Sequence, residues 1–158
     1  MKKSKDIFDG IDYQEIAKEI INSSIQNKRI APAYLFTGPK GVGQKEIALR
    51  FLEGVVDKES QEINTRSLLE KGNHPDLYFI EPKYINKGKL MTQSEIQDLN
   101  LSINSSPQIR IEQIKDLIRF LNKKPIKSKL NMVIIEDVDK LNESASNSLL
   151  KTIEEPLN

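Results

Sequence analysis

The sequence predicts an α/β domain built around a phosphate-binding loop, and two separate stretches indicate this. In the first, the apolar run Ala33–Phe36 leads into a loop with glycines at Gly38, Gly41 and Gly43, and an amphipathic segment follows at once. Glycines let successive backbone N–H groups turn toward one point, and the next helix adds the positive end of its dipole. In the second, an apolar run ends in two acids within residues 132–137. Carboxylates at the end of a parallel strand meet the metal and the attacking water in nucleotide-hydrolysing folds.

The glycine loop keeps the spacing of the phosphate-loop pattern but lacks its reactive residues. The pattern is glycine, four residues, glycine, lysine, then serine or threonine. Gln44 stands where the lysine would contact the outer phosphates, and Lys45 where a hydroxyl would hold magnesium. Lys45 cannot replace the lysine, because one step along a helix turns a side chain by roughly 100°. The candidate nucleotide-binding residues are Gly38, Pro39, Lys40, Gly41, Val42, Gly43, Gln44 and Lys45. A plain glycine-rich turn is the alternative.

The composition of the 158-residue chain is that of a soluble globular protein, long enough for one domain with a core. A formal net charge of +1 gives no reason to expect strong binding of nucleic acid or of an anionic membrane by the whole surface. The chain has no cysteine, which excludes disulfides and thiolate metal sites. No apolar run of signal or bilayer length is present, so we expect a cytoplasmic protein with no membrane partner.

The first half of the chain has three segments that we expect to be helices, two of them amphipathic. The first begins at Asp12, whose carboxylate would cap it while Glu15 reaches back. Its apolar stripe consists of Ile16, Ala17, Ile20, Ile21 and Ile25. The stripe of the second, after the glycine loop, consists of Ile47, Ala48, Phe51, Leu52 and Val55. The third spans residues 60–71 and stops at Gly72, because glycine favours the left-handed conformation at a helix end.

A short apolar run fenced by prolines, residues 74–82, then predicts a buried strand. His74 is the only histidine, and no nucleophile or cysteine lies nearby in the sequence. We therefore assign it a structural role in a turn rather than catalysis or metal binding. Residues 83–108 are polar and too long for an ordinary connection in a compact domain, so we expect a mobile loop or a local excursion of the chain.

Two further helices and a strand follow. The helix over residues 110–122 has an apolar face made of Ile114, Leu117, Ile118 and Leu121. For the basic link that follows, residues 123–129, we favour a solvated connector over a phosphate contact. The strand over residues 132–135 ends in Glu136 and Asp137. Asn142 is expected to cap the last helix. The side chains of this helix that we expect to face the core are Ala145, Leu149, Leu150 and Ile153.

The last helix carries the string Ser-Leu-Leu-Lys-Thr-Ile-Glu-Glu-Pro at residues 148–156, which is far more specific than a phosphate loop. Together with residues 33–39, 74–76 and 111–114, this string resembles bacterial clamp-loader subunits, most closely the delta prime subunits of DNA polymerase III. The resemblance covers nearly the whole chain. It implies that residues 1–158 form part of an AAA+ domain, a three-layer fold in which a parallel sheet is flanked by helices.

Three departures from this family bear on function. Its ATP-hydrolysing members, the tau and gamma subunits, have the lysine and hydroxyl that Gln44 and Lys45 replace, and an Asp-Glu pair where this chain has Glu136 and Asp137. Family members commonly carry a cysteine-bound zinc module, and without cysteines we expect no zinc. The chain also stops after Pro156, before the family's next strand and its Ser-Arg-Cys motif, so we expect an N-terminal portion of a longer chain.

The resemblance therefore implies a non-catalytic subunit of a DNA-directed DNA polymerase holoenzyme, which assists a neighbour in loading the sliding clamp onto primed DNA. Its partners would be the delta and the tau or gamma subunits, with the clamp and DNA reached through the complex. We expect no cofactor, at most weak ATP binding, and no independent ATPase activity. A tau- or gamma-like motor with a degenerate loop is the alternative, and an unrelated phosphate-loop protein is a third.

Overall fold

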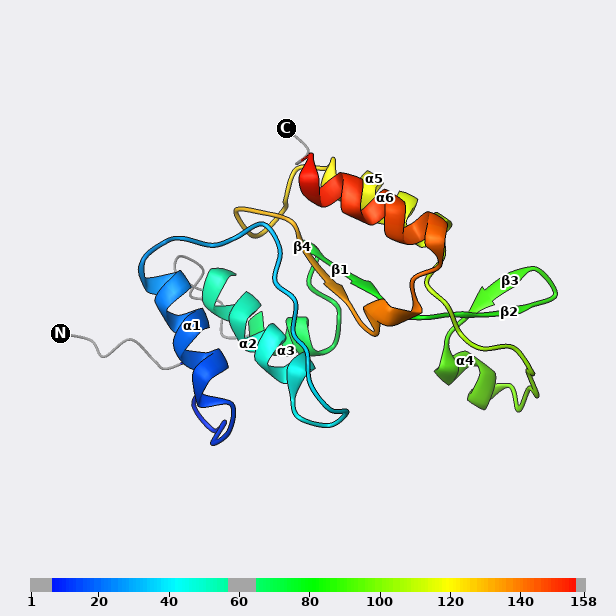
Figure 1. Cartoon of the computed structure of the whole chain (residues 1–158), viewed down its shortest axis with the longest axis horizontal. Coiled ribbons are helices and arrows are strands. Elements are labelled where there is room, and N and C mark those ends of the chain that lie inside the picture. The colour runs from blue at the N-terminus through cyan, green and yellow to red at the C-terminus, as the bar shows by residue number, and fades with distance from the viewer. Residues whose placement is uncertain (1–6, 57–64, 156–158) are drawn as a thin grey trace. The chain divides into compact units, whose positions relative to one another are not determined.

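The computed structural model describes residues 7–56 and 65–155, and the chain divides into two compact units. Unit 1 comprises residues 1–77 and 125–132, and unit 2 comprises residues 78–124 and 133–158. Figure 1 shows the elements of both, which we describe one unit at a time. No helix in the described ranges is both long and apolar enough to cross a bilayer.

Unit 1 is built from the helices α1 (Glu15–Gln26), α2 (Gln44–Val56) and α3 (Thr65–Glu70). Its buried core consists of Phe8, Ile11, Ile21, Ile25, Ile47 and Phe51. Gly54 lets α2 approach α1 closely, since a Cβ on it would lie 2.8 Å from Cδ1 of Ile25. All three predicted helices of the first half are therefore present, although residues 60–64 of the third lie outside the described residues.

The predicted start of α1 at Asp12 is wrong. The residue before the helix is Gln14, which has φ of +60° and makes no side-chain cap. Glu15 pairs with Lys18 at 2.7 Å instead of reaching back, so a local ion pair replaces the expected capping box. The stripe is also only partly buried, because Ile16 is exposed while Ile21, about 140° around the helix, lies in the core.

The expected strand over residues 33–36 is also wrong, because these residues form no strand. A strand needs a hydrogen-bonded neighbour, and no strand in the described part of the chain pairs with this segment. The segment still alternates as a strand would: Tyr34 and Phe36 pack against the core of unit 1, and Leu35 is exposed. Burial of the two aromatic rings thus holds the segment in place without hydrogen bonds to a neighbouring strand.

The strands β1 (Leu77–Ile80) and β4 (Met132–Ile135) lie within the two predicted strand segments and form a small parallel sheet, the kind of sheet that the family resemblance implies. The Met132 N–H donates to the Asp76 carbonyl at 2.8 Å, and the Glu136 N–H donates to the Ile80 carbonyl at 2.9 Å. From the first bond to the second, the residue numbers rise on both strands, so the two strands run parallel.

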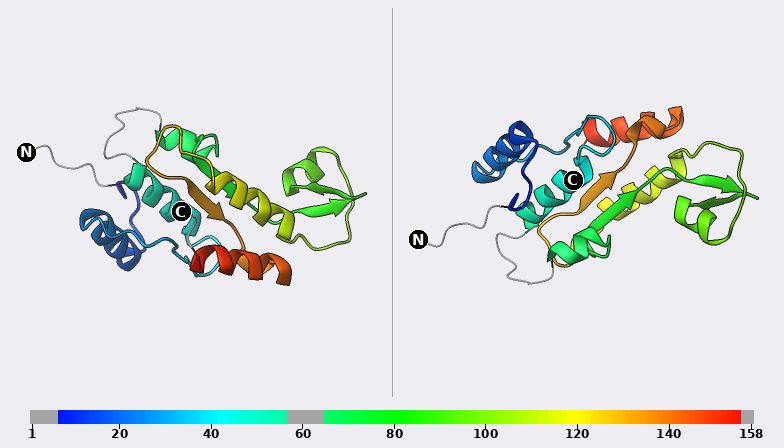
Figure 2. Two further views of the ribbon diagram at one scale, coloured as in Figure 1. Left: turned by 90° about the horizontal axis from the view of Figure 1, so that it is seen from above. Right: turned by 90° about the horizontal axis from the view of Figure 1, so that it is seen from below.

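The helices α5 (Ile111–Leu121) and α6 (Glu143–Glu154) of unit 2 lie side by side and pack on the sheet (Figures 1 and 2). The buried core of this unit consists of Ile80, Ile109, Ile114, Leu117 and Ala145. Tyr78 and Val133 pack against this core, because alternate strand residues share one face of a sheet. Unit 2 is thus a mixed α/β arrangement organised by the apolar faces of its two helices.

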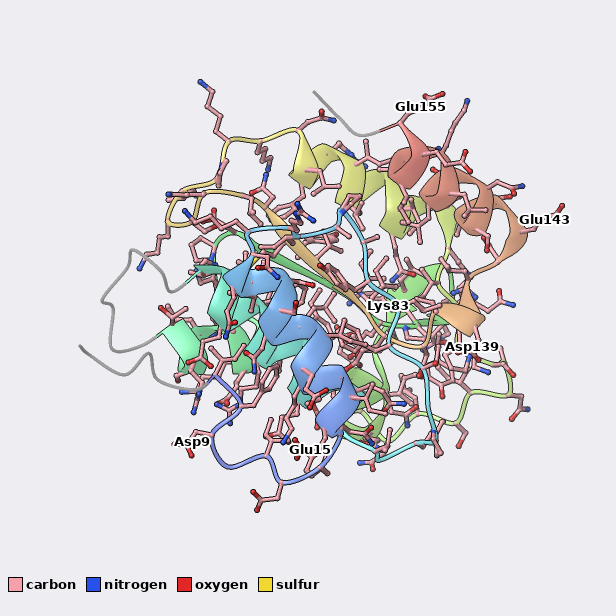
Figure 3. All side chains as sticks on the ribbon, turned by 60° about the vertical axis from the view of Figure 1, so that its left-hand side comes forward. Asp9, Glu15, Lys83, Asp139, Glu143 and Glu155 are labelled. Carbon is pink, nitrogen blue, oxygen red and sulfur yellow. The ribbon has the colours of Figure 1, made fainter. Side chains whose placement is uncertain are left out.

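The predicted cap of α6 is confirmed, because the side-chain oxygen of Asn142 accepts a hydrogen bond from the Ala145 N–H at 2.9 Å. Glu143 and Glu155, labelled in Figure 3, mark the two ends of this helix. The inward face is narrower than expected, since Leu150 and Ile153 are 57% and 41% exposed.

Residues 84–98 contain two strands and a short helix, whereas residues 99–107 form no helix or strand. The strands β2 (Tyr84–Asn86) and β3 (Lys89–Met91) make an antiparallel hairpin, which the short helix α4 (Gln93–Asp98) follows. Lys87 and Gly88, with φ of +48° and +81°, form the two-residue turn. Figure 2 shows the hairpin and α4 beyond the N-terminal end of α5. The expectation of a mobile loop or a local excursion of the chain over residues 83–108 stays a prediction.

Candidate nucleotide site at the glycine loop

The loop between Gly38 and Gly43 leads directly into α2, whose first residue is Gln44. Gly41 and Gly43 have φ of +82° and +90°, a left-handed conformation that side chains other than glycine rarely adopt. A Cβ on Gly43 would also lie 2.6 Å from Cε2 of Tyr13. Position 43 therefore favours glycine because of its backbone conformation, and an added Cβ would also force the Tyr13 ring to shift.

Gln44, at the position of the phosphate-binding lysine, turns its side chain back onto the loop. Its Nε2 donates hydrogen bonds to the carbonyls of Gly38 at 2.9 Å and of Pro39 at 3.2 Å. A neutral amide thus bridges the loop's own backbone. The candidate residues 38–45 are contiguous, and this amide closes their loop together with the hydrogen bond from the Val42 N–H to the Pro39 carbonyl at 3.3 Å.

Tyr13 and Glu46 form a contact beside the loop that the sequence did not predict. The Tyr13 hydroxyl donates to Oε2 of Glu46 at 2.7 Å, and Oε1 of Glu46 lies 3.6 Å from Nη2 of Arg50. The hydrogen bond to Glu46 is the largest cause that raises the pKa of Tyr13. Tyr13 precedes α1 in a segment without helical periodicity, so no spacing rule relates it to a residue 33 positions later.

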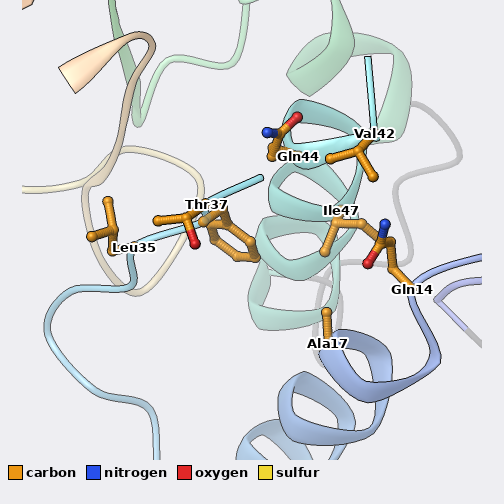
Figure 4. A pocket seen from close by; sticks show the side chains of 8 residues that line it. Gln14, Ala17, Leu35, Thr37, Val42, Gln44 and Ile47 are labelled. Atoms are coloured by element: carbon orange, nitrogen blue, oxygen red, sulfur yellow. The ribbon is translucent and has the colours of Figure 1, made fainter. Parts of the chain in front are cut away.

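A cavity of about 210 Å³ adjoins the loop. Figure 4 shows Gln14 and Ala17 on the same side as Val42 and Ile47, with Leu35 and Thr37 opposite them. Binding sites for small molecules usually measure about 300 to 1,000 Å³. The cavity in this conformation is therefore smaller than an ordinary ligand site.

The acidic residues Glu136 and Asp137 follow β4 directly, as predicted. The Glu136 backbone is tied to the sheet through Ile80, and Asp137, with φ of +47°, precedes a short 3-10 helix, Val138–Lys140. Both acids belong to unit 2, whereas the glycine loop belongs to unit 1. Their part in a common nucleotide site stays a prediction.

A second feature missed by the sequence reasoning is the buried carboxylate of Asp76. It accepts hydrogen bonds from the backbone N–H groups of Ile126, Lys127 and Ser128 at 2.6 to 2.7 Å, and from the Ser128 hydroxyl at 2.9 Å. Burial raises its pKa, but the hydrogen bonds lower it by more, so the pKa of Asp76 lies below its usual range. Asp76 therefore holds residues 126–128 of the basic link in place.

His74 is buried in the turn before β1, and its Nδ1 accepts a hydrogen bond from the Asp76 N–H at 3.2 Å. The Leu77 N–H closes the turn on the His74 carbonyl at 3.1 Å. This is the structural position predicted for the only histidine. The His-Pro-Asp stretch thus orders the turn and presents the Asp76 carboxylate to the basic link.

Comparison with known proteins identifies the family. A family model described as DNA polymerase III, delta subunit, matches residues 13–158. The chain is 30% identical over 151 residues to the DNA polymerase III subunit delta' of Bacillus subtilis, covering 92% of this chain and 39% of that protein. It is 27% identical over 132 residues to the delta' subunit of Pseudomonas aeruginosa, covering 80% of this chain and 34% of that protein.

Similarity extends to a second kind of subunit. The chain is 25% identical over 160 residues to the DNA polymerase III subunit tau/gamma of Haemophilus influenzae, covering 98% of this chain and 20% of that protein. No solved structure matches. The chain spans 39% or less of the length of these three relatives. The family model matches most of the length of this chain, which shows that the chain belongs to the DNA polymerase III delta' subunit family.

Proposed function

We propose that this chain is a non-catalytic clamp-loader subunit of DNA polymerase III. In this role it is an AAA+ scaffold that assists a neighbouring subunit, which hydrolyses ATP to load the sliding clamp onto primed DNA. Membership of the delta' family supports the assignment to the polymerase. The small parallel sheet with helices packed on it is compatible with an AAA+ domain.

The observation that carries the non-catalytic part of the proposal is the side chain of Gln44. Its amide donates to the carbonyls of Gly38 and Pro39, and it has no charge to offer a phosphate. Loss of one charge-assisted hydrogen bond typically forfeits about 1.5 to 3 kcal/mol. Lys45 adds to this deficit, because an ammonium cannot ligate magnesium. We therefore propose a degenerate phosphate loop with weak or no ATP binding and no hydrolysis.

A second candidate is an ATP-hydrolysing motor subunit of the tau or gamma type. The similarity to the tau/gamma subunit of Haemophilus influenzae over 98% of this chain favours it. In that case Gln44 and Lys45 would be unusual but competent replacements. Steady ATP turnover by the chain alone distinguishes the two candidates.

An assembly experiment tests the proposed partnership. The full-length subunit is mixed with the delta and the tau or gamma subunits of its own organism, and clamp loading is followed on primed DNA with a labelled sliding clamp. We expect it to co-elute with the other subunits and to be required for loading. Removal of the phosphate-loop lysine from tau or gamma should abolish loading, whereas Gln44→Ala should leave it unchanged. Loading that proceeds at an equal rate without this subunit contradicts the proposal.

A further inference from the structure

Tyr13 lies against Gly43, the last glycine of the loop. Its Cε2 and hydroxyl atoms would be 2.6 and 2.8 Å from a Cβ on Gly43, so the ring is in contact with the backbone of this residue. Gly43 immediately precedes α2, at the end where a helix offers its N–H groups to an anion. The aromatic ring therefore covers Gly43 at the junction between the loop and the start of α2.

The backbone that presents Tyr13 is strained. The next residue, Gln14, has φ of +60° and ψ of +45°, a conformation that costs a residue other than glycine on the order of 1 kcal/mol. No side-chain cap at the start of α1 offsets this cost. Strain of this kind persists only where surrounding contacts enforce it, and the contact of Tyr13 with the loop is such a contact.

The hydroxyl of Tyr13 also holds a negative charge at the start of α2. Glu46 lies in the first turn of this helix, and its carboxylate is fixed between the Tyr13 hydroxyl at 2.7 Å and Arg50 at 3.6 Å. A carboxylate in the first turn complements the helix dipole. The chain's own anion thus occupies the electrostatic position that makes a helix start attractive to phosphate.

We propose that Tyr13 closes the glycine loop to triphosphates, independently of the substitutions at Gln44 and Lys45. The ring covers Gly43, and the hydroxyl holds Glu46 where it repels a second anion. This inference rests on the proposed non-catalytic function and extends it, since the loop is then blocked by contacts as well as deprived of its reactive residues. Restoring the lysine and the hydroxyl should therefore be insufficient to restore binding.

Calorimetric titration with Mg-ATP tests this with three variants of the chain. Gln44→Lys/Lys45→Thr restores the two reactive residues, and the same pair with Tyr13→Ala also removes the ring. We expect the triple variant to bind Mg-ATP about two- to fivefold more tightly than the double variant, because the ring no longer covers Gly43 and Glu46 is no longer held at the helix start, where a charge is typically worth about 0.3 to 1 kcal/mol. The control replaces Tyr84, from the hairpin of unit 2, with alanine in the double variant, and should not alter affinity. Equal affinity of the double and triple variants overturns the role of Tyr13.

Two milder variants keep the test decisive if Tyr13→Ala unfolds the chain. Tyr13 and Glu46 are 41% and 48% exposed, so Tyr13→Phe and Glu46→Gln should preserve the fold. In the double background each should tighten Mg-ATP binding severalfold, and an unchanged affinity for both contradicts the inference. Micromolar binding and turnover by the unaltered chain would instead refute the proposed function, which separates the two failures.

Discussion

Replacing Asp76 with asparagine should destabilise the protein more than any exposed substitution, because this carboxylate is 1% exposed and accepts hydrogen bonds on both oxygens. Asparagine has nearly the same shape but retains one acceptor oxygen and presents an NH₂ group in place of the other. If its oxygen faces the Ile126 N–H, its NH₂ group meets the N–H donors of Lys127 and Ser128. The substitution therefore tests the hydrogen bonds without creating a cavity.

The magnitude follows from the bonds that are lost. Each hydrogen bond to a charged group contributes about 1.5 to 3 kcal/mol, and losses within one network are not additive. Loss of the two backbone bonds to Oδ2 of Asp76 should therefore lower the free energy of unfolding by about 3 kcal/mol. For a domain of this size, that corresponds to a fall in Tm of about 6 to 12 °C.

The pH dependence of stability gives a second signature. The folded pKa of Asp76 lies below its unfolded value, so the unfolded chain takes up the proton first as the pH falls. The stabilisation by Asp76 is therefore fully present above the unfolded pKa of about 4 and is lost as the pH falls through the folded pKa. The difference between the unaltered chain and Asp76→Asn should be constant near neutral pH and shrink below about pH 4.

Urea unfolding followed by circular dichroism measures both effects. Asp139→Asn is the matched control, because the Asp139 side chain is 72% exposed and its only described ion pair is with the neighbouring Lys140 at 3.4 Å. This control should change stability by no more than about 0.5 kcal/mol. A loss below about 1 kcal/mol for Asp76→Asn, or equal losses for both variants, would refute the reasoning.

Three other substitutions or measurements test separate parts of the account. Asn142→Ala should cost about 1 kcal/mol in urea unfolding, because it removes the hydrogen bond to the Ala145 N–H; an unchanged midpoint would mean that the cap contributes nothing. Gly43→Ala should cost about 2 kcal/mol, since alanine is strained at φ of +90° and its Cβ meets Tyr13; wild-type stability would contradict the loop geometry. Elemental analysis of the purified protein should find no stoichiometric zinc, because thiolate ligands are absent from the sequence, and one zinc per chain would refute this.

Elements with strong local signals were predictable from the sequence. The acidic strand end follows an apolar run of four residues that forms β4, and Asn142 caps α6 as its residue type predicts. The helix over residues 110–122 is found as α5 because its apolar face repeats at helical spacing. Each of these signals lies within a few residues of the structure that it specifies.

The predictions fail where contacts between residues far apart in the sequence determine the structure. Residues 33–36 have the apolar composition of a strand, but a strand also requires a partner, which composition does not reveal. The hydrogen bonds between Tyr13 and Glu46 and between Asp76 and Ser128 join residues that lie far apart in the sequence. Spacing rules cover neighbours along one element, so neither contact has a sequence signature.

The most direct test of the central claim, that the glycine loop is not catalytic, is an ATPase measurement on the purified full-length subunit. Calorimetric titration with Mg-ATP and steady-state phosphate release are measured on the same sample, and a tau or gamma subunit of the same organism serves as positive control. We expect no saturable binding at micromolar ATP and no turnover above the buffer rate. Micromolar affinity together with steady turnover, abolished by Gln44→Ala, would contradict the claim and identify the chain as a motor subunit.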